Sequence, residues 1–273
     1  MRFLILSLVF YSVIILPLQA QVGHKENDTL VNYIDINNKK QGKWVKRYDD
    51  GQIRYKGYFD NDEPVGTFFY YHPDGSLKSV LDYSKKDVIS AELYWPGGKP
   101  AATGKYNKLH QRIGYWKIYF EDGVLSTEVN YINDTIDGFV RMFYPSGDKL
   151  LDCNYVHGVL TGNYTRYFAG GNVHESGLYK DNKKEGIFKI YDPEKNLAET
   201  GPYVQGMRHG LWYFYEGGKC IDTVKYIYDA PDCMDANSKE LQEKIEWAKQ
   251  NQDKFKNPED YLDNPIEFFR NNK

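Results

Sequence analysis

The sequence predicts an all-β protein, an elongated open antiparallel meander of about eight β-hairpins of 24 residues each. The first observation is a glycine that recurs every 24 residues or at a multiple of 24, although only 24 of the 273 residues are glycine. The second is a turn signal between two short apolar runs within each interval. A fixed period of this length is typical of repeat architectures. The recurring glycines are Gly42, Gly66, Gly114, Gly138, Gly162, Gly186 and Gly210, and Ser90 fills the one vacant slot.

The unit that begins at Gly114 shows how each interval builds its first strand. Trp116 follows the glycine by two positions, and Ile118 follows by four. Because side chains alternate along a strand, these two share one face, which we assign to the packed side of the sheet together with Phe188 and Trp212. A second aromatic stands five positions after most of the glycines and has the opposite parity. This fifth-position set comprises Tyr71, Trp95, Tyr119, Phe143, Tyr167, Tyr191 and Tyr215.

A turn and a second strand complete each hairpin. Asp122-Gly123 is a strong hairpin signal, because glycine supplies the positive φ that the turn needs. The second strand opens on Leu125 and closes on Tyr131, and a polar link leads to the next glycine. Eight such hairpins, each packed mainly on its neighbours, would extend for about 75 Å.

The unit at Ser90 departs most from this pattern. Glu92 occupies the position of the first aromatic, and Trp95-Pro96-Gly97-Gly98 replaces the Asp-Gly turn. The register of this unit is therefore left open.

The pattern resembles the MORN repeat variant of bacterial proteins, in which a glycine, an aromatic, a tyrosine and a second glycine recur. The best matches are GKWVKRYDDG at 42, GYWKIYFEDG at 114 and GNYTRYFAGG at 162, and the resemblance covers residues 42–233. It implies the repeat type and says little about activity. Proteins with such repeats include antitoxin-like proteins of the YwqK type, so the resemblance implies an antitoxin or immunity role as one alternative.

The ends of the chain carry different signals. Residues 1–20 read as a secretory signal peptide, with Arg2 before an apolar run from Phe3 to Leu16 and the small residue Ala20 at the expected cleavage point. The run is short for a spanning helix, so cleavage is favoured over an uncleaved anchor. We expect a mature protein outside the cytoplasm, in the periplasm, at the cell surface or secreted, with no further membrane span.

Residues 21–41 form a lead segment, and residues 234–273 read as a helical tail. Asn237 is a candidate N-cap with Glu240 three positions later, and an apolar stripe of Leu241, Ile245 and Ala248 follows. Because a repeat array exposes its terminal apolar face, we expect this tail to cap the repeat that begins at Gly210.

Composition excludes some functions. After loss of Arg2 with the signal, 34 basic residues remain against 38 acidic ones, so general binding of nucleic acid is not expected.

The three cysteines leave two alternatives open. Cys220 and Cys233 could form a disulfide in an oxidising compartment, which would leave Cys153 as a buried thiol, or all three could be reduced.

No residue pattern predicts catalysis, cofactor binding or a metal site. The six histidines lack metal-ligand spacing, and there is no phosphate-binding glycine loop and no serine nucleophile elbow. Residues 60–63 are acidic but lack the rest of a calcium-binding loop.

The aromatic residues are the remaining functional signal. The fifth-position set would form rungs on the solvent side, suited to stacking on sugar rings or anchoring a peptide. The alternative is that these rings only hold hairpin to hairpin. We therefore expect a non-enzymatic binding or scaffolding surface for a protein or a surface polysaccharide, and a hydrolase of cell-surface polymer as the rival from another class.

Overall fold

The computed structural model describes residues 23–26 and 29–231, which form strands and turns and contain no helix. None of these residues belongs to a helix long and apolar enough to cross a membrane. The strands are β1 (His24–Glu26), β2 (Thr29–Val31), β3 (Tyr33–Ile34), β4 (Lys40–Arg47), β5 (Ile53–Asp60), β6 (Glu63–Tyr71), β7 (Leu77–Lys85), β8 (Val88–Tyr94), β9 (Pro100–Asn107), β10 (Arg112–Tyr119), β11 (Leu125–Ile132), β12 (Thr135–Phe143), β13 (Lys149–Val156), β14 (Val159–Tyr167), β15 (Val173–Lys180), β16 (Lys183–Tyr191), β17 (Leu197–Val204), β18 (Met207–Arg208), β19 (Gly210–Glu216), β20 (Lys219–Ile227) and β21 (Ala230–Pro231).

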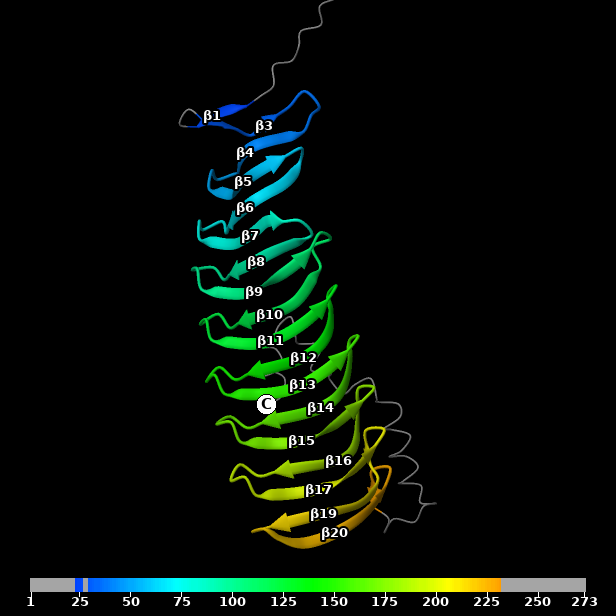
Figure 1. Cartoon of the computed structure of the whole chain (residues 1–273). Helices are drawn as coiled ribbons and strands as arrows, with labels where there is room; N and C mark the ends of the chain where they lie inside the picture. Colours follow the sequence, from blue (N-terminus) through cyan, green and yellow to red (C-terminus); the bar gives the residue numbers. More distant parts are fainter. Residues whose placement is uncertain (1–22, 27–28, 232–273) are drawn as a thin grey trace, which may run out of the picture.

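The strands form one long antiparallel sheet in chain order (Figure 1). Only β1 and β2 pair separately, and β17 pairs with both β18 and β19. The sheet stays open, because β3 and β20 lie at opposite ends and no described pairing joins β3 to β21 (Figure 1). The predicted open meander of hairpins is confirmed.

The recurring glycines occupy backbone positions that other residues rarely adopt. All seven have positive φ, between 63° at Gly114 and 112° at Gly138. At five of them, Gly66, Gly114, Gly138, Gly162 and Gly186, the register with the preceding strand also shifts, as it does between Val129 and Tyr131 opposite Gly138. A glycine in such a bulge bends the strand, so the period in the sequence marks a repeated bend in the sheet.

The links between hairpins are tight turns. Asn133 and Asp134 both have positive φ, at 50° and 65°, as in the two-residue turns that match strand twist. The Asp134 amide also donates to the Arg112 carbonyl at 3.0 Å, and the Asp134 carboxylate accepts from the Arg112 amide at 3.0 Å. The polar residues of these links therefore tie each turn to the strand two before it.

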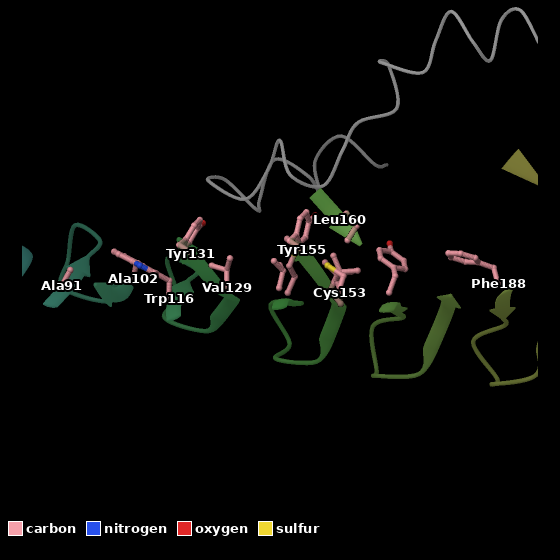
Figure 2. Packing of buried hydrophobic residues seen from close by; sticks show 14 of the residues in the cluster. Ala91, Ala102, Trp116, Val129, Tyr131, Cys153, Tyr155, Leu160 and Phe188 are labelled. Carbon is pink, nitrogen blue, oxygen red and sulfur yellow. The ribbon is translucent and has the colours of Figure 1, made fainter. Parts of the chain in front are cut away.

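One face of the sheet, here called the inner face, carries the core. Trp116, Phe188 and Trp212 are only 2%, 0% and 0% exposed, which confirms their assignment to the packed face. Figure 2 shows the labelled core residues, from Ala91 to Phe188, in a row on one side of the ribbon. Rings of successive strands meet edge to face along this row, with Phe188 and Tyr203 centroids 5.1 Å apart. Such pairs stabilise hairpin on hairpin beyond the area they bury.

Four further glycines lie beneath the inner-face rings and were not recognised from the sequence. A Cβ at Gly104 would lie 2.1 Å from the Trp116 ring, and one at Gly201 would lie 2.4 Å from the Trp212 ring. Gly57 and Gly177 lie beneath Phe68 and Phe188 in the same way. These glycines make room for the rings of the neighbouring strand, which is a packing role distinct from that of the periodic glycines.

The structure settles the register of the unit at Ser90. Ile89, not Ser90, takes the place of the glycine, because Ile89 pairs with Tyr106 as Gly114 pairs with Tyr131. Ala91 then fills the slot of the first aromatic, and the assignment of Glu92 to that slot is wrong. Ile89 lies 23 residues after Gly66 and 25 residues before Gly114, so the two irregular spacings cancel and the 24-residue period conceals the slip.

The signal peptide at 1–20, the helical tail at 234–273 and a disulfide to Cys233 lie outside the described residues. Cys153 is fully buried on the inner face, as expected, and Cys220 is exposed on β20.

Candidate binding surface

The opposite face of the sheet, here called the outer face, carries an aromatic ring at the same position of each hairpin over most of its length. These rings come from the first strand of each hairpin, just before its turn, and are half-buried. We call them the outer row. Its members are Tyr71, Tyr94, Tyr119, Phe143, Tyr167, Tyr191 and Tyr215. Adjacent members stand two strands apart, about 10 Å.

The outer row differs at one position from the set predicted from the sequence. Tyr94 pairs with Pro100 as Tyr119 pairs with Leu125, so Tyr94 is the fifth-position residue of its unit. Trp95 belongs one position later, because its amide donates to the Lys99 carbonyl at 2.8 Å in the way that begins the other turns. The inclusion of Trp95 is therefore wrong, and the one-residue slip of this unit is the reason.

Trp95 instead belongs to a set of sixth-position side chains that join one hairpin turn to the next. Its Nε1 donates to the Tyr119 carbonyl at 3.2 Å. Each of these bonds reaches the backbone of an outer-row residue in the following unit and thereby holds that residue in place. The other members are Tyr48, whose hydroxyl donates to the Tyr71 carbonyl at 2.8 Å, Tyr144, whose hydroxyl donates to the Tyr167 carbonyl at 2.9 Å, and His72, whose Nε2 lies 3.1 Å from the Tyr94 carbonyl.

Charged side chains of the outer face connect its rings across several strands. Glu128 accepts a hydrogen bond from the Tyr115 hydroxyl and lies 3.6 Å from Arg141. Arg141 lies 3.4 Å from Asp152, whose carboxylate also accepts from Lys149 at 3.2 Å. These groups run from β10 to β13, so the surface beside the outer row is polar and ordered by its own contacts.

Two tyrosines of this face have shifted acidities. The hydrogen bond to Glu92 raises the pKa of Tyr94 to about 12. Burial, followed by the hydrogen bond to Glu128, raises the pKa of Tyr115 above its usual range. Both phenols therefore stay protonated at neutral pH and act as hydrogen-bond donors to their carboxylates.

The outer face is hollowed where the irregular unit meets its neighbours. The residues that line this hollow include Ser90 of β8, Thr103 of β9, and Tyr115, Lys117 and Tyr119 of β10. The hollow is open to solvent and has a volume of about 540 Å³. It adjoins the outer row at Tyr119, which places a mixed polar and aromatic recess beside the row.

The acidic residues of this region are engaged in local contacts. Asp82, which lines the hollow, accepts from the Ser84 hydroxyl at 2.5 Å and from the Ser84 amide at 3.0 Å, and these bonds lower the pKa of Asp82. Glu92 accepts from Tyr94 at 2.6 Å. Within residues 23–26 and 29–231, no cluster of histidine, cysteine and carboxylate side chains could hold a metal ion.

The segment 60–63, weighed as a calcium site, forms one of the tight turns. The Asp60 carboxylate accepts from Asn61 at 2.8 Å, and the Asp62 carboxylate accepts from the Lys40 amide at 2.9 Å. His110 and His157 also lie between strands, with positive φ of 58° and 50°.

The comparison with known families agrees with this geometry. The model of the MORN repeat variant matches residues 40–61, 64–85, 112–133 and 184–205. No curated protein matches the chain. The hairpins between the matched segments keep the same registers, with Gly138 opposite Tyr155 and Gly162 opposite Tyr179 as Gly114 is opposite Tyr131. Four segments of the chain thus match the MORN repeat variant, and the hairpins between them share its geometry.

Proposed function

We propose that this protein is a non-enzymatic binding or scaffolding protein that acts outside the cytoplasm and holds an extended partner along its outer row. The partner is a surface polysaccharide or an extended segment of an envelope protein. The proposed location rests on the apolar run from Phe3 to Leu16 in the sequence.

The observation that carries the proposal is the continuity of the outer row. Seven rings at a spacing of about 10 Å offer equivalent contacts along a polymer, each weak by itself. The larger inner-face rings cannot serve in this way, since Phe68, Trp116, Phe188 and Trp212 are at most 2% exposed. Half-buried rings with fixed backbones are suited to stacking on sugar rings or on apolar peptide side chains.

The experiment measures binding of the mature chain, residues 21–273, to purified envelope polysaccharides and to envelope proteins. Single alanine substitutions at Tyr119, Phe143, Tyr167 and Tyr191 are expected to weaken binding by about threefold each, and the fourfold variant by about 100-fold. Gradual loss is the expected sign of a multivalent surface.

A matched control changes exposed aliphatic side chains of the same face that do not belong to the outer row. Leu178, Ile187 and Leu211 are 49%, 58% and 47% exposed. Their alanine variants are expected to bind as the unchanged chain does. If the control variants lose binding as much as the outer-row variants do, the row has no special role.

An enzymatic role is the competing outcome. The proposal would be overturned in favour of a hydrolase if the protein cleaved a cell-surface polymer, if Glu92→Gln abolished this cleavage, and if the outer-row variants cleaved normally. Neutralisation of a toxin without any binding of envelope components would instead favour the antitoxin-like alternative.

A further inference from the structure

The hollow on the outer face is lined by charged side chains in an ordered arrangement. It spans β7, β8, β9 and β10, four successive strands of the sheet (Figure 1). Its polar side chains form two rows across the strands, and in each row a short hydroxyl residue stands between an acidic residue and a lysine. The rows are Glu92, Thr103 and Lys117 on β8, β9 and β10, and Asp82, Ser90 and Lys105 on β7, β8 and β9.

The short hydroxyl residue keeps the opposite charges of each row apart. An acidic residue and a lysine that stand two strands apart are separated by about 10 Å at the backbone. Within residues 23–26 and 29–231, Lys105 and Lys117 form no ion pair. Elsewhere on this face opposite charges stand on adjacent strands and do pair, since Arg141 lies 3.6 Å from Glu128 and 3.4 Å from Asp152. The hollow therefore holds charges of both signs that do not pair with each other.

The same side chains keep unused hydrogen-bonding capacity. Oδ1 of Asp82 and Oε2 of Glu92 accept the local hydrogen bonds given above, but no group of the described residues donates to Oδ2 or Oε1. The hydroxyls of Ser90 and Thr103 and both lysine ammonium groups likewise form no hydrogen bond with any residue that the structure describes. The hollow thus offers free donors, free acceptors and hydroxyls within a volume of about 540 Å³.

The lining as a whole does not favour a charged ligand. Its two lysines and two carboxylates sum to no net charge. A bound anion would lie near Asp82 and Glu92, and a bound cation would lie near Lys105 and Lys117, so repulsion would offset attraction in either case. An uncharged ligand with many hydroxyl groups meets no such repulsion, since each hydroxyl donates to a carboxylate or accepts from an ammonium group.

Aromatic rings beside the two rows supply an apolar contact. Tyr119 of the outer row and Tyr115, which is 42% exposed, also line the hollow. The Tyr115 hydroxyl donates to Glu128, and this bond holds the ring in place. A sugar ring combines several hydroxyl groups with an apolar C–H face that stacks on such rings. A peptide segment has one amide donor and one carbonyl acceptor per residue, so it brings fewer polar groups into the same space.

We propose that the hollow is a subsite for one uncharged sugar residue of a neutral polysaccharide. The sugar lies over Ser90 and Thr103, between the carboxylates and the ammonium groups of the two rows, and its apolar face contacts Tyr119. This inference rests on the proposed function and narrows the partner from a surface polysaccharide or a protein segment to a neutral polysaccharide. Because the rings of the outer row repeat, a distinct subsite of this kind also sets the position of the polymer along the row.

The first test fills the hollow. The affinity of the mature chain is measured by calorimetry for laminarin, dextran and mannan, for the neutral and the acidic fractions of the envelope polysaccharides, and for polygalacturonate. Ser90→Phe is expected to weaken binding of a neutral polysaccharide at least about tenfold, because the added ring occupies the space of the sugar. The matched control is Asn163→Phe, since Asn163 follows Gly162 as Ser90 follows Ile89 and is exposed on the same face. The control is expected to bind as the unchanged chain does, and circular dichroism checks that both variants are folded.

The second test changes charge without adding bulk. Lys117→Met and Glu92→Gln are each expected to weaken binding of the neutral polysaccharide about fivefold, since each loses a charge-assisted hydrogen bond. Lys189→Met is the matched control, because Lys189 pairs with Thr200 at the position where Lys117 pairs with Glu128. An anionic ligand would instead bind more tightly to Glu92→Gln, and a cationic ligand would bind more tightly to Lys117→Met. The affinity for the neutral polysaccharide is also expected to stay constant between about 50 mM and about 500 mM sodium chloride.

The outcomes separate this subsite from the proposed function. Tighter binding by either charge variant, equal losses in Ser90→Phe and Asn163→Phe, or binding confined to the acidic polysaccharides or to an envelope protein would overturn the subsite. A triple alanine variant at Phe143, Tyr167 and Tyr191 tests the outer row outside the hollow. If this variant loses binding and Ser90→Phe does not, only the subsite is wrong. If Ser90→Phe loses binding and the triple variant does not, the subsite stands and the role of the outer row is wrong.

Discussion

Replacing Gly201 by alanine is expected to lower the free energy of unfolding by about 3 kcal/mol, which is large for the addition of one methyl group. The new Cβ would lie 2.4 Å from the Trp212 ring. That ring is 0% exposed and is held by Tyr203, whose centroid lies 5.1 Å away, and by a hydrogen bond from its Nε1 to the Pro202 carbonyl at 3.0 Å. The ring therefore cannot move without breaking its own contacts. Urea denaturation followed by circular dichroism measures the effect.

Gly186 is the matched control, because glycine is needed there for the backbone conformation and not to make room for a ring. It has a φ of 74° and would have nothing within 4 Å of an added Cβ. Alanine there is expected to destabilise by about 1 kcal/mol, and asparagine by less, since asparagine tolerates the left-handed conformation. At Gly201 asparagine should be at least as harmful as alanine. If Gly186→Ala is the more harmful alanine variant, the two glycine roles have been assigned the wrong way round.

Phe188→Ala is expected to destabilise the array by about 4 kcal/mol. Phe188 is 0% exposed, and its ring packs edge to face with Tyr203 at 5.1 Å and with Tyr179 at 6.0 Å. It also covers Gly177, so the substitution leaves a cavity that no neighbouring side chain can fill. Because each repeat depends on its neighbours, the loss should lower the unfolding midpoint of the whole array.

Tyr191→Ala provides the comparison on the same strand, β16. Tyr191 belongs to the outer row and is half-buried, so its removal is expected to destabilise by less than about 1.5 kcal/mol. Equal losses for Phe188→Ala and Tyr191→Ala would contradict the division of the sheet into a packed inner face and an accessible outer face.

Much of the fold could be predicted from the sequence because the same local signals recur in almost every repeat. The period of the glycines located the bends, the Asp-Gly pairs located the turns, and strand parity assigned Trp116, Phe188 and Trp212 to the packed face correctly. These features depend only on local backbone chemistry and on side-chain alternation. The glycines beneath the rings are different. Gly57, Gly104, Gly177 and Gly201 serve rings on an adjacent strand, and only the pairing of strands shows this.

The positions of the outer-row rings on the sheet were predicted in every unit but one, and that difference has a simple cause. A shortened unit before Ile89 and a lengthened one after it leave the flanking glycines, Gly66 and Gly114, in phase, so counting from them misplaces the residues between. Trp95 consequently replaced Tyr94 in the predicted set. The sixth-position hydrogen bonds could not be predicted, since they join side chains to backbone carbonyls of the following unit.

The neighbouring residues Tyr94 and Trp95 provide the most direct test that the outer row binds the partner. The measurement compares the melting temperatures of Tyr94→Ala and Trp95→Ala. It also compares their affinities for an envelope polysaccharide or protein that binds the mature chain. Tyr94→Ala is expected to weaken binding by about threefold with little change in melting temperature. Trp95→Ala removes the hydrogen bond to the Tyr119 carbonyl but keeps every ring of the outer row, so it should lower the melting temperature and weaken binding less than Tyr94→Ala does. Reduced affinity in Trp95→Ala at an unchanged melting temperature, with Tyr94→Ala silent in binding, would contradict the outer row as the binding surface.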